Sequence, residues 1–139
     1  MGRQRNVQVQ VAERGVEILK IARSFVDDPA RFEWLRALLA SYGLDASAGI
    51  LVELRSVPDQ GCWVHYGMWL TSSEVFLRFV AEEKYGARPL DQSGLLDYSR
   101  LEDVTQQVST AEHVPGVGKP FGLLAINAMR QVIKVVHGQ

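Results

Sequence analysis

Residues 50–70 read ILVELRSVPDQGCWVHYGMWL, and this stretch decides the fold because its hydrophobic side chains recur at every second position. A period of two is typical of a β-strand whose two faces meet different surroundings. The run Pro58-Asp59-Gln60-Gly61 interrupts the alternation, and its proline, aspartate and glycine favour a tight turn. The stretch therefore predicts a β-hairpin, with one strand before this turn and a second strand over residues 62–70.

The second strand of the hairpin has two chemically different faces. Its even-numbered residues lie on one face, and its odd-numbered residues, which include Trp63, His65 and Trp69, lie on the other. If the tryptophan face is the outer one, Trp63 and Trp69 are candidate partner-binding residues, because Trp, Tyr and Arg dominate binding hot spots. Alternatively, these large side chains cover a second layer of the core.

The chain before the hairpin is predicted to be helical. Over residues 11–26, apolar side chains recur at spacings of three and four, which is the period of an α-helix. Asp28-Pro29 is a helix-start signal, and a second apolar stripe follows over residues 32–42. We therefore expect residues 1–43 to form two antiparallel helices joined by a tight connection.

The chain after the hairpin is less regular. Residues 74–84 fit either a strand or a helix, and their aromatic and β-branched content favours a third strand. A short helix is expected near residues 99–108. Residues 120–136 are apolar over most of a helical circumference, which predicts a long buried helix. The sequence thus predicts a single α+β domain over residues 1–139, with an N-terminal helical hairpin, an antiparallel β-meander of about three strands and a long C-terminal helix packed on the sheet.

Composition limits the classes of partner. The formal net charge is −1, whereas a protein that binds phosphate backbones usually carries a basic surplus, so nucleic acid is not the expected partner. No apolar run approaches the ~18 residues that span a bilayer, and the N-terminus does not resemble a signal peptide. We therefore expect a cytoplasmic protein that does not associate with membranes.

No catalytic motif is found. The run Pro115-Gly116-Val117-Gly118-Lys119-Pro120 lacks two features of a phosphate-binding loop, because His113 and Pro120 stand where that loop needs glycine and Ser or Thr. The single cysteine, Cys62, excludes an intramolecular disulfide and a Cys-rich zinc site. Strand alternation directs Cys62 and His65 to different faces of the sheet, which is a poor geometry for a nucleophile and its base. We therefore expect no catalytic residue, no metal ligand and no cofactor.

Residues 82–112 carry seven acidic and three basic residues. The segment is either a solvated loop and helix face or an acidic patch that attracts a basic partner. On the second interpretation, the candidate partner-binding residues are Glu82, Glu83, Asp91, Asp97, Glu102 and Asp103.

The stretches at residues 67–71, 76–79 and 113–122, followed by an apolar helix, resemble small bacterial immunity proteins encoded beside polymorphic or contact-dependent growth-inhibition toxins. The resemblance covers roughly the C-terminal half of the chain. It implies a non-enzymatic protein that neutralises one cognate toxin domain by direct contact. Such toxins are often basic nucleases, which would suit an acidic face. The alternative hypothesis is a small-molecule-binding domain or minor enzyme with a pocket between helix and sheet.

Overall fold

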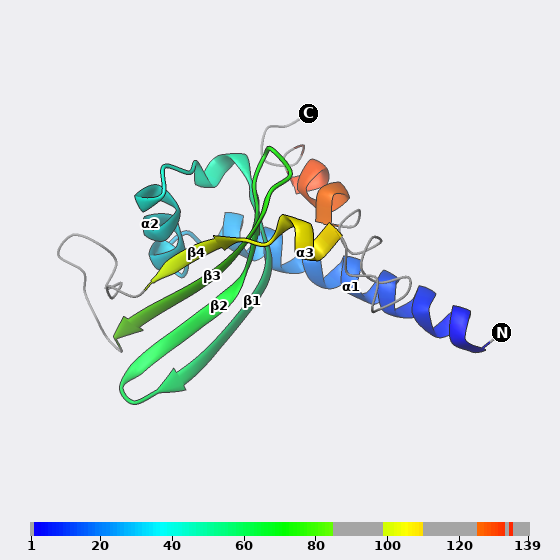
Figure 1. Cartoon of the computed structure of the whole chain (residues 1–139), viewed down its shortest axis with the longest axis horizontal. Coiled ribbons are helices and arrows are strands. Elements are labelled where there is room, and N and C mark those ends of the chain that lie inside the picture. The colour runs from blue at the N-terminus through cyan, green and yellow to red at the C-terminus, as the bar shows by residue number, and fades with distance from the viewer. Residues whose placement is uncertain (1, 85–98, 110–124, 133, 135–139) are drawn as a thin grey trace.

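A computed structural model describes residues 2–84, 99–109, 125–132 and 134 of the chain (Figure 1). Side chains are described from residue 15 onward, except at residue 109. In chain order the elements are α1 (Gly2–Asp27), α2 (Glu33–Ser41), the short 3-10 helix η1 (Ala46–Ala48), β1 (Ile50–Asp59), β2 (Cys62–Leu70), β3 (Phe76–Lys84), β4 (Arg100–Asp103) and α3 (Thr105–Ser109). Residues 125–132 are also helical. The predicted α+β class is confirmed.

The four strands form one antiparallel sheet in the order β1-β2-β3-β4. β1 and β2 are joined by a two-residue turn, in which Gln60 and Gly61 have positive φ angles of 49° and 83°. Such a turn matches the twist of the strands that it joins. The predicted hairpin is therefore confirmed, and so is the third strand over residues 74–84.

The fourth strand differs from the prediction, which places a short helix near residues 99–108. Arg100–Asp103 pairs with β3 instead, with Leu101 opposite Phe79, and α3 begins only at Thr105. Three of the four residues of β4 are charged, so its sequence has no apolar alternation. Pairing with a neighbouring strand, rather than any local pattern, makes this segment extended.

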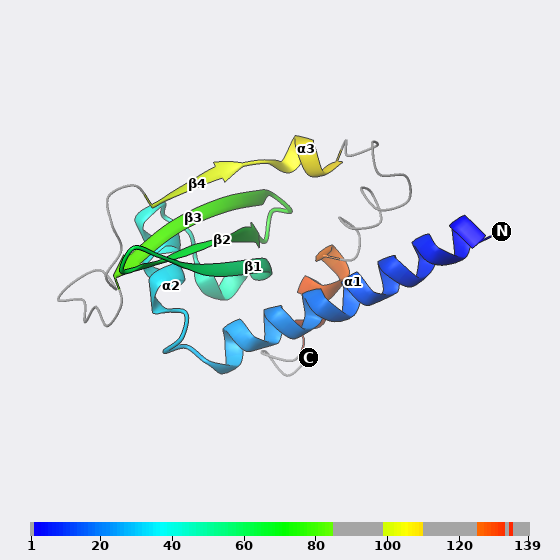
Figure 2. The same ribbon diagram turned by 90° about the horizontal axis from the view of Figure 1, so that it is seen from below.

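Both N-terminal helices are confirmed, but each rests on the sheet. α1 lies against β1 and α2 against β3, so the expected helical hairpin does not form along the length of the helices (Figure 2). Phe25, near the end of α1, and Phe32, just before α2, are both buried, with ring centroids 5.5 Å apart. α2 begins at Glu33, beyond the predicted start at Asp28-Pro29, and the buried Phe32 is its N-cap residue.

The sheet is packed on both faces. The first core joins α1, the helix at residues 125–132 and the sheet, and it contains Ile18, Ala22, Ile50, Val52, Leu70, Phe76, Val104, Ala125, Ala128, Met129 and Val132. The second core joins α2 to the opposite face and contains Phe25, Phe32, Trp34, Leu35, Leu38, Leu39, Leu51, Trp69, Phe79 and Ala81. Consecutive residues such as Trp69 and Leu70 enter different cores because side chains alternate along a strand.

The C-terminal helix is shorter than predicted in the described part of the chain. Residues 125–132 form its continuous stretch, and Ala125, Ala128, Met129 and Val132 line its buried side. The other positions of the helix predicted over residues 120–136 lie outside the described residues, apart from residue 134. The described stretch packs in the first core together with α1, which agrees with its apolar pattern.

Candidate functional site

In the described part of the chain, the acidic residues predicted to bind a partner are divided between the two sides of the sheet. Glu102 lies opposite Arg78 and Asp103 lies opposite Leu77, so these two neighbours point to different faces of the sheet. Glu82 and Glu83 are divided in the same way because they are consecutive in β3. Asp91 and Asp97 lie outside the described residues. The four residues that can be placed are therefore divided between the two sides of the sheet, and their role in partner binding stays a prediction.

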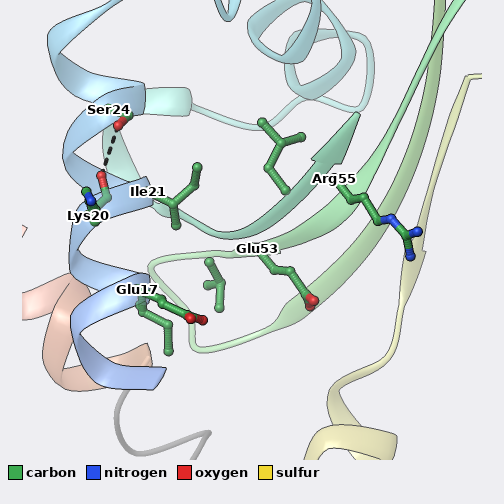
Figure 3. Close-up of a pocket in the computed structure, with 9 residues that line it drawn as sticks. Glu17, Lys20, Ile21, Ser24, Glu53 and Arg55 are labelled. Atoms are coloured by element: carbon green, nitrogen blue, oxygen red, sulfur yellow. Dashed lines mark hydrogen bonds between the residues drawn. The ribbon is translucent and has the colours of Figure 1, made fainter. Parts of the chain in front are cut away.

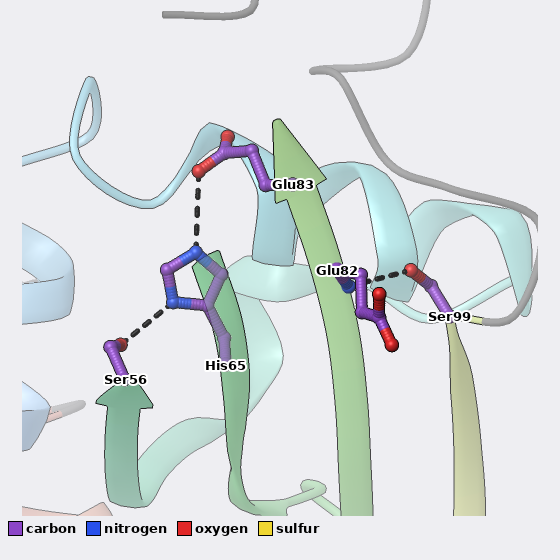
Figure 4. Close-up of polar contacts among 5 residues, drawn as sticks. All are labelled: Ser56, His65, Glu82, Glu83 and Ser99. Atoms are coloured by element: carbon purple, nitrogen blue, oxygen red, sulfur yellow. Dashed lines mark hydrogen bonds and ion pairs between the residues drawn. The ribbon is translucent and has the colours of Figure 1, made fainter. Parts of the chain in front are cut away.

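Two of these acids have roles within the fold. The Asp103 carboxylate accepts hydrogen bonds from the Thr105 backbone N–H at 2.9 Å and from its hydroxyl at 2.6 Å, so it satisfies the first N–H of α3. These hydrogen bonds lower the pKa of Asp103. Glu83 accepts from His65, while the backbone N–H of Glu82 donates to the Ser99 hydroxyl at 3.1 Å (Figure 4).

The face of the hairpin that carries Trp63 and Trp69 is the side of the sheet that packs in the second core. Trp69 is 1% exposed and packs edge-on against Phe25, with ring centroids 5.0 Å apart. It is therefore not accessible to a partner, in agreement with the alternative that tryptophan covers a second core layer. Trp63, nearer the hairpin turn, is 37% exposed and remains accessible.

His65 is the one buried polar or charged residue among those that the structure describes. Its Nδ1 lies 2.7 Å from the Ser56 hydroxyl and its Nε2 lies 3.2 Å from a carboxylate oxygen of Glu83 (Figure 4). The Trp34 ring covers one side of the imidazole. Register explains part of this arrangement, since Ser56 and His65 are directly opposed in β1 and β2. The sequence gives no indication of it, because the pairing register sets the partners.

The electrostatics of His65 favour a neutral ring. Burial lowers the pKa of His65, and the hydrogen bond and charge of Glu83 offset only part of this effect. A carboxylate can only accept, so Nε2–H donates to Glu83 and the Nδ1 lone pair accepts from the Ser56 hydroxyl. Ser56, His65 and Glu83 are hydrogen-bonded in the order of a nucleophile, a base and an acid. Activation of a serine also requires oxyanion donors and space for a substrate. Ser56 does not line the groove between α1 and β1.

A different surface presents apolar side chains that belong to neither core. Tyr66 lies opposite Arg55 and Val80, Val64 lies opposite Val57, and all point to the same face of the sheet. We call this surface the Tyr66 face; it consists of Arg55, Val57, Val64, Tyr66, Arg78 and Val80. The arginines are exposed, and the valines and Tyr66 are half-buried.

The Tyr66 face lies toward the hairpin turn, which projects away from α1 and α2 in Figure 1. The Arg55 guanidinium lies 5.7 Å from the centroid of the Tyr66 ring, a cation–π distance. Three acidic residues, Glu53, Glu82 and Glu102, share this side of the sheet, so its charge is mixed. The face thus combines Tyr66 and two arginines with a small apolar centre. Tyr and Arg are among the side chains enriched at protein interfaces.

A groove of about 440 Å³ runs between α1 and β1. Its lining residues are Glu17, Ile18, Lys20, Ile21 and Ser24 of α1, and Val52, Glu53, Leu54 and Arg55 of β1. Figure 3 shows Glu17 and Ile21 directed from α1 toward β1, and the Ser24 hydroxyl donating to the Lys20 carbonyl at 3.0 Å. Since Arg55 also belongs to the Tyr66 face, the groove and that face are adjacent.

Within the described residues, no group of three or more His, Cys, Asp or Glu side chains could hold a metal ion. None of the described helices is both long and apolar enough to cross a membrane. Comparison with protein-family models gave no match, and neither the curated proteins nor the solved structures contain a match to this chain.

Proposed function

We propose that this chain is a bacterial immunity protein, a non-enzymatic binding protein that neutralises a cognate toxin domain by direct contact through the Tyr66 face. The observation that carries the proposal is the cross-strand cluster of Tyr66, Val57, Val64 and Val80, which lies outside both cores and beside Arg55 and Arg78. Partly exposed apolar clusters with a polar rim mark interaction sites. The class of partner, a toxin domain, is inferred from the resemblance of the C-terminal half to immunity proteins.

The charges around the face support selection of one partner. Glu102 opposes Arg78 across β3 and β4, and Glu82 lies near Val64 and Val80. A surface with both signs of charge rejects a partner whose charges are arranged differently, because juxtaposed like charges cost several kcal/mol. Such discrimination suits a protein that has to recognise one toxin domain among related ones.

The decisive experiment starts from the gene immediately upstream, which the proposal expects to encode the cognate toxin domain; a neighbourhood without a toxin gene would count against the proposal. We expect co-expression with this chain to restore growth of a bacterial host, and the purified pair to form a complex. Tyr66→Ala should weaken binding by about 2 kcal/mol or more, which is roughly 30-fold in Kd. Tyr42→Ala is the matched control, because Tyr42 is 50% exposed at the end of α2, away from this face.

The outcome separates the hypotheses clearly. A Tyr66→Ala variant that stays folded and binds like the wild type would exclude the Tyr66 face. A neighbouring toxin domain that neither binds this chain nor is inhibited by it would overturn the immunity function itself.

The groove between α1 and β1 favours a second candidate function, which is binding of a small molecule or minor enzymatic activity. Its volume of about 440 Å³ falls within the range of roughly 300–1,000 Å³ that is usual for ligand pockets. A metabolic operon around the gene, and an increase in thermal midpoint with one of its metabolites, would support this function over immunity.

A further inference from the structure

We propose that the groove between α1 and β1 binds an extended peptide segment of the protein partner, which adds to the sheet as a strand beside β1. This inference rests on the proposed function, in that it assumes a protein partner. It goes further by assigning a second contact surface and the backbone conformation of the segment that occupies it.

β1 forms an edge of the sheet that no described strand covers. β1 is the outermost strand and pairs with β2 on one side only, and no described residue pairs with its other side. An edge strand offers a row of backbone N–H and C=O groups to another chain, and strand addition is a common mode of peptide recognition.

The groove reaches both sides of β1. Four consecutive residues of β1, at positions 52–55, line it. The bulge between Leu51 and Glu53 breaks the alternation, so Val52, Glu53 and Arg55 lie on the side of the first core. Leu54 packs against the second core on the other side. A groove lined from both sides of the sheet lies at the edge of the strand.

α1 forms the opposite wall of the groove. Glu17, Lys20, Ile21 and Ser24 of α1 are spaced by three and four, so they form one face of the helix. Ile18, Ile21, Val52 and Leu54 supply apolar surface, and two acidic and two basic residues, Glu17, Glu53, Lys20 and Arg55, border it. A peptide between these walls would gain backbone hydrogen bonds from β1 and an apolar contact for every second side chain.

The ends of the groove limit the length of the segment. The pairing of β1 with β2 is interrupted by a bulge between Leu51 and Glu53. Pro58, near the other end of β1, has no N–H to donate. The regular edge between them spans a few residues, at about 3.3 Å each. The balanced charges at the border favour a segment that is short, of low net charge and aliphatic at alternate positions.

The experiment uses a phage-displayed library of random heptapeptides, selected on the full chain. We expect enriched peptides to carry aliphatic side chains at every second position. The best binder is then synthesised with single N-methyl groups at each backbone amide in turn. Strand addition predicts that affinity falls about five- to tenfold at alternate amides, which face β1, and changes little at the others.

Two substitutions in α1 locate the peptide. Ile21→Ser removes apolar surface from the groove and should weaken peptide binding by about tenfold. Val16→Ser is the matched control, because Val16 is 65% exposed on the same helix and does not line the groove. Circular dichroism of both variants verifies that the fold is retained.

The possible outcomes are distinct. Failure to enrich any peptide, an N-methyl profile without alternation, or equal binding by wild type and Ile21→Ser would each overturn strand addition in this groove. If the neighbouring toxin domain binds through Tyr66 while Ile21→Ser has no effect on that complex, the groove inference fails and the proposed function stands. If peptides bind with the expected alternation but the toxin domain does not bind, the immunity function fails and the groove assignment stands.

Discussion

Trp34 of α2 and His65 of β2 stack face to face, with ring centroids 4.0 Å apart and ring planes 8° apart. Both side chains are buried. The contact joins α2 to the sheet and removes the imidazole from water. Ser56 and Glu83 satisfy the two ring nitrogens, so burial of this polar ring leaves no unpaired donor. The stability of the fold should therefore depend on the protonation state of His65.

Folding stability should decrease in mildly acidic solution. Burial lowers the pKa of folded His65 below its ordinary value of 6.5, a direction that the charge of Arg31 reinforces and Glu83 opposes. Between the folded-state pKa and 6.5, the unfolded chain binds more protons, so the free energy of unfolding falls as pH falls. The stability contributed by neutral His65 is complete above pH 6.5 and is lost as pH decreases through the folded-state pKa.

Urea unfolding from about pH 8 to about pH 5 measures this effect. Asp45 and Asp103 do not interfere, because hydrogen bonds lower their pKa values from an ordinary value of 3.8. His65→Gln should lower stability at neutral pH and flatten the dependence on pH. Identical dependence in the variant and the wild type would show that His65 does not cause it.

Gly67→Ala should strongly destabilise the sheet. A Cβ atom at residue 67 would overlap the backbone carbonyl of Glu53 in β1, beside the bulge. A backbone group cannot move aside like a flexible side chain, so we expect a cost of more than about 3 kcal/mol, above the usual range for overpacking. Gly43→Ala is the control for strain alone. Its φ is +72° with no atom within 4 Å of an added Cβ, so it should cost about 1–2 kcal/mol in urea unfolding. Equal costs for the two variants would contradict the overlap.

The sequence predicts the local elements of this fold better than its surfaces. The period of two and the turn at Pro58-Asp59-Gln60-Gly61 are sufficient for the hairpin, because both are local properties of the chain. β4 could not be predicted, since its four residues become a strand only by pairing with β3. The part of the sheet that the helices leave uncovered could not be predicted either, because it depends on where α1 and α2 pack. Trp69 is buried for this reason, while Tyr66 is half-exposed.

The acidic residues illustrate the same limit. A count over residues 82–112 shows a negative segment, but strand alternation distributes Glu82 and Glu83 between opposite faces. Composition cannot reveal this division unless the extent and register of β3 are already known.

Ala128→Asp should unfold the domain. Ala128 is buried in the first core between α1 and the sheet, so the new carboxylate would be buried without a partner. Such a group costs several kcal/mol, out of a total stability of about 5–15 kcal/mol for a domain. Asn127→Asp is the control, since Asn127 is exposed on the same helix. Thermal unfolding should show loss of the cooperative transition in the first variant only, and an unchanged midpoint for Ala128→Asp would mean that this helix is not part of the core.

The last prediction concerns the acidic residues on the side of the sheet that carries the Tyr66 face. If the toxin domain is basic, Glu82 and Glu102 should accelerate its encounter with this chain, because opposite charges act before contact is made. The double variant Glu82→Gln/Glu102→Gln should therefore associate more slowly at low salt, by about tenfold, and show a weaker dependence on salt. Dissociation should change little, since charges at an interface rim affect association more than the lifetime of the complex.

Asp27→Asn/Glu33→Gln removes the same number of charges at exposed positions of α1 and α2, away from the Tyr66 face, and serves as the control. Stopped-flow association rates at low and high salt compare both double variants with the wild type. If the two double variants slow association equally, only the net charge of the chain matters, and the Tyr66 face has no electrostatic role of its own. A slower rate for Glu82→Gln/Glu102→Gln alone would locate the encounter at this face, because the two variants differ only in where the charge is removed.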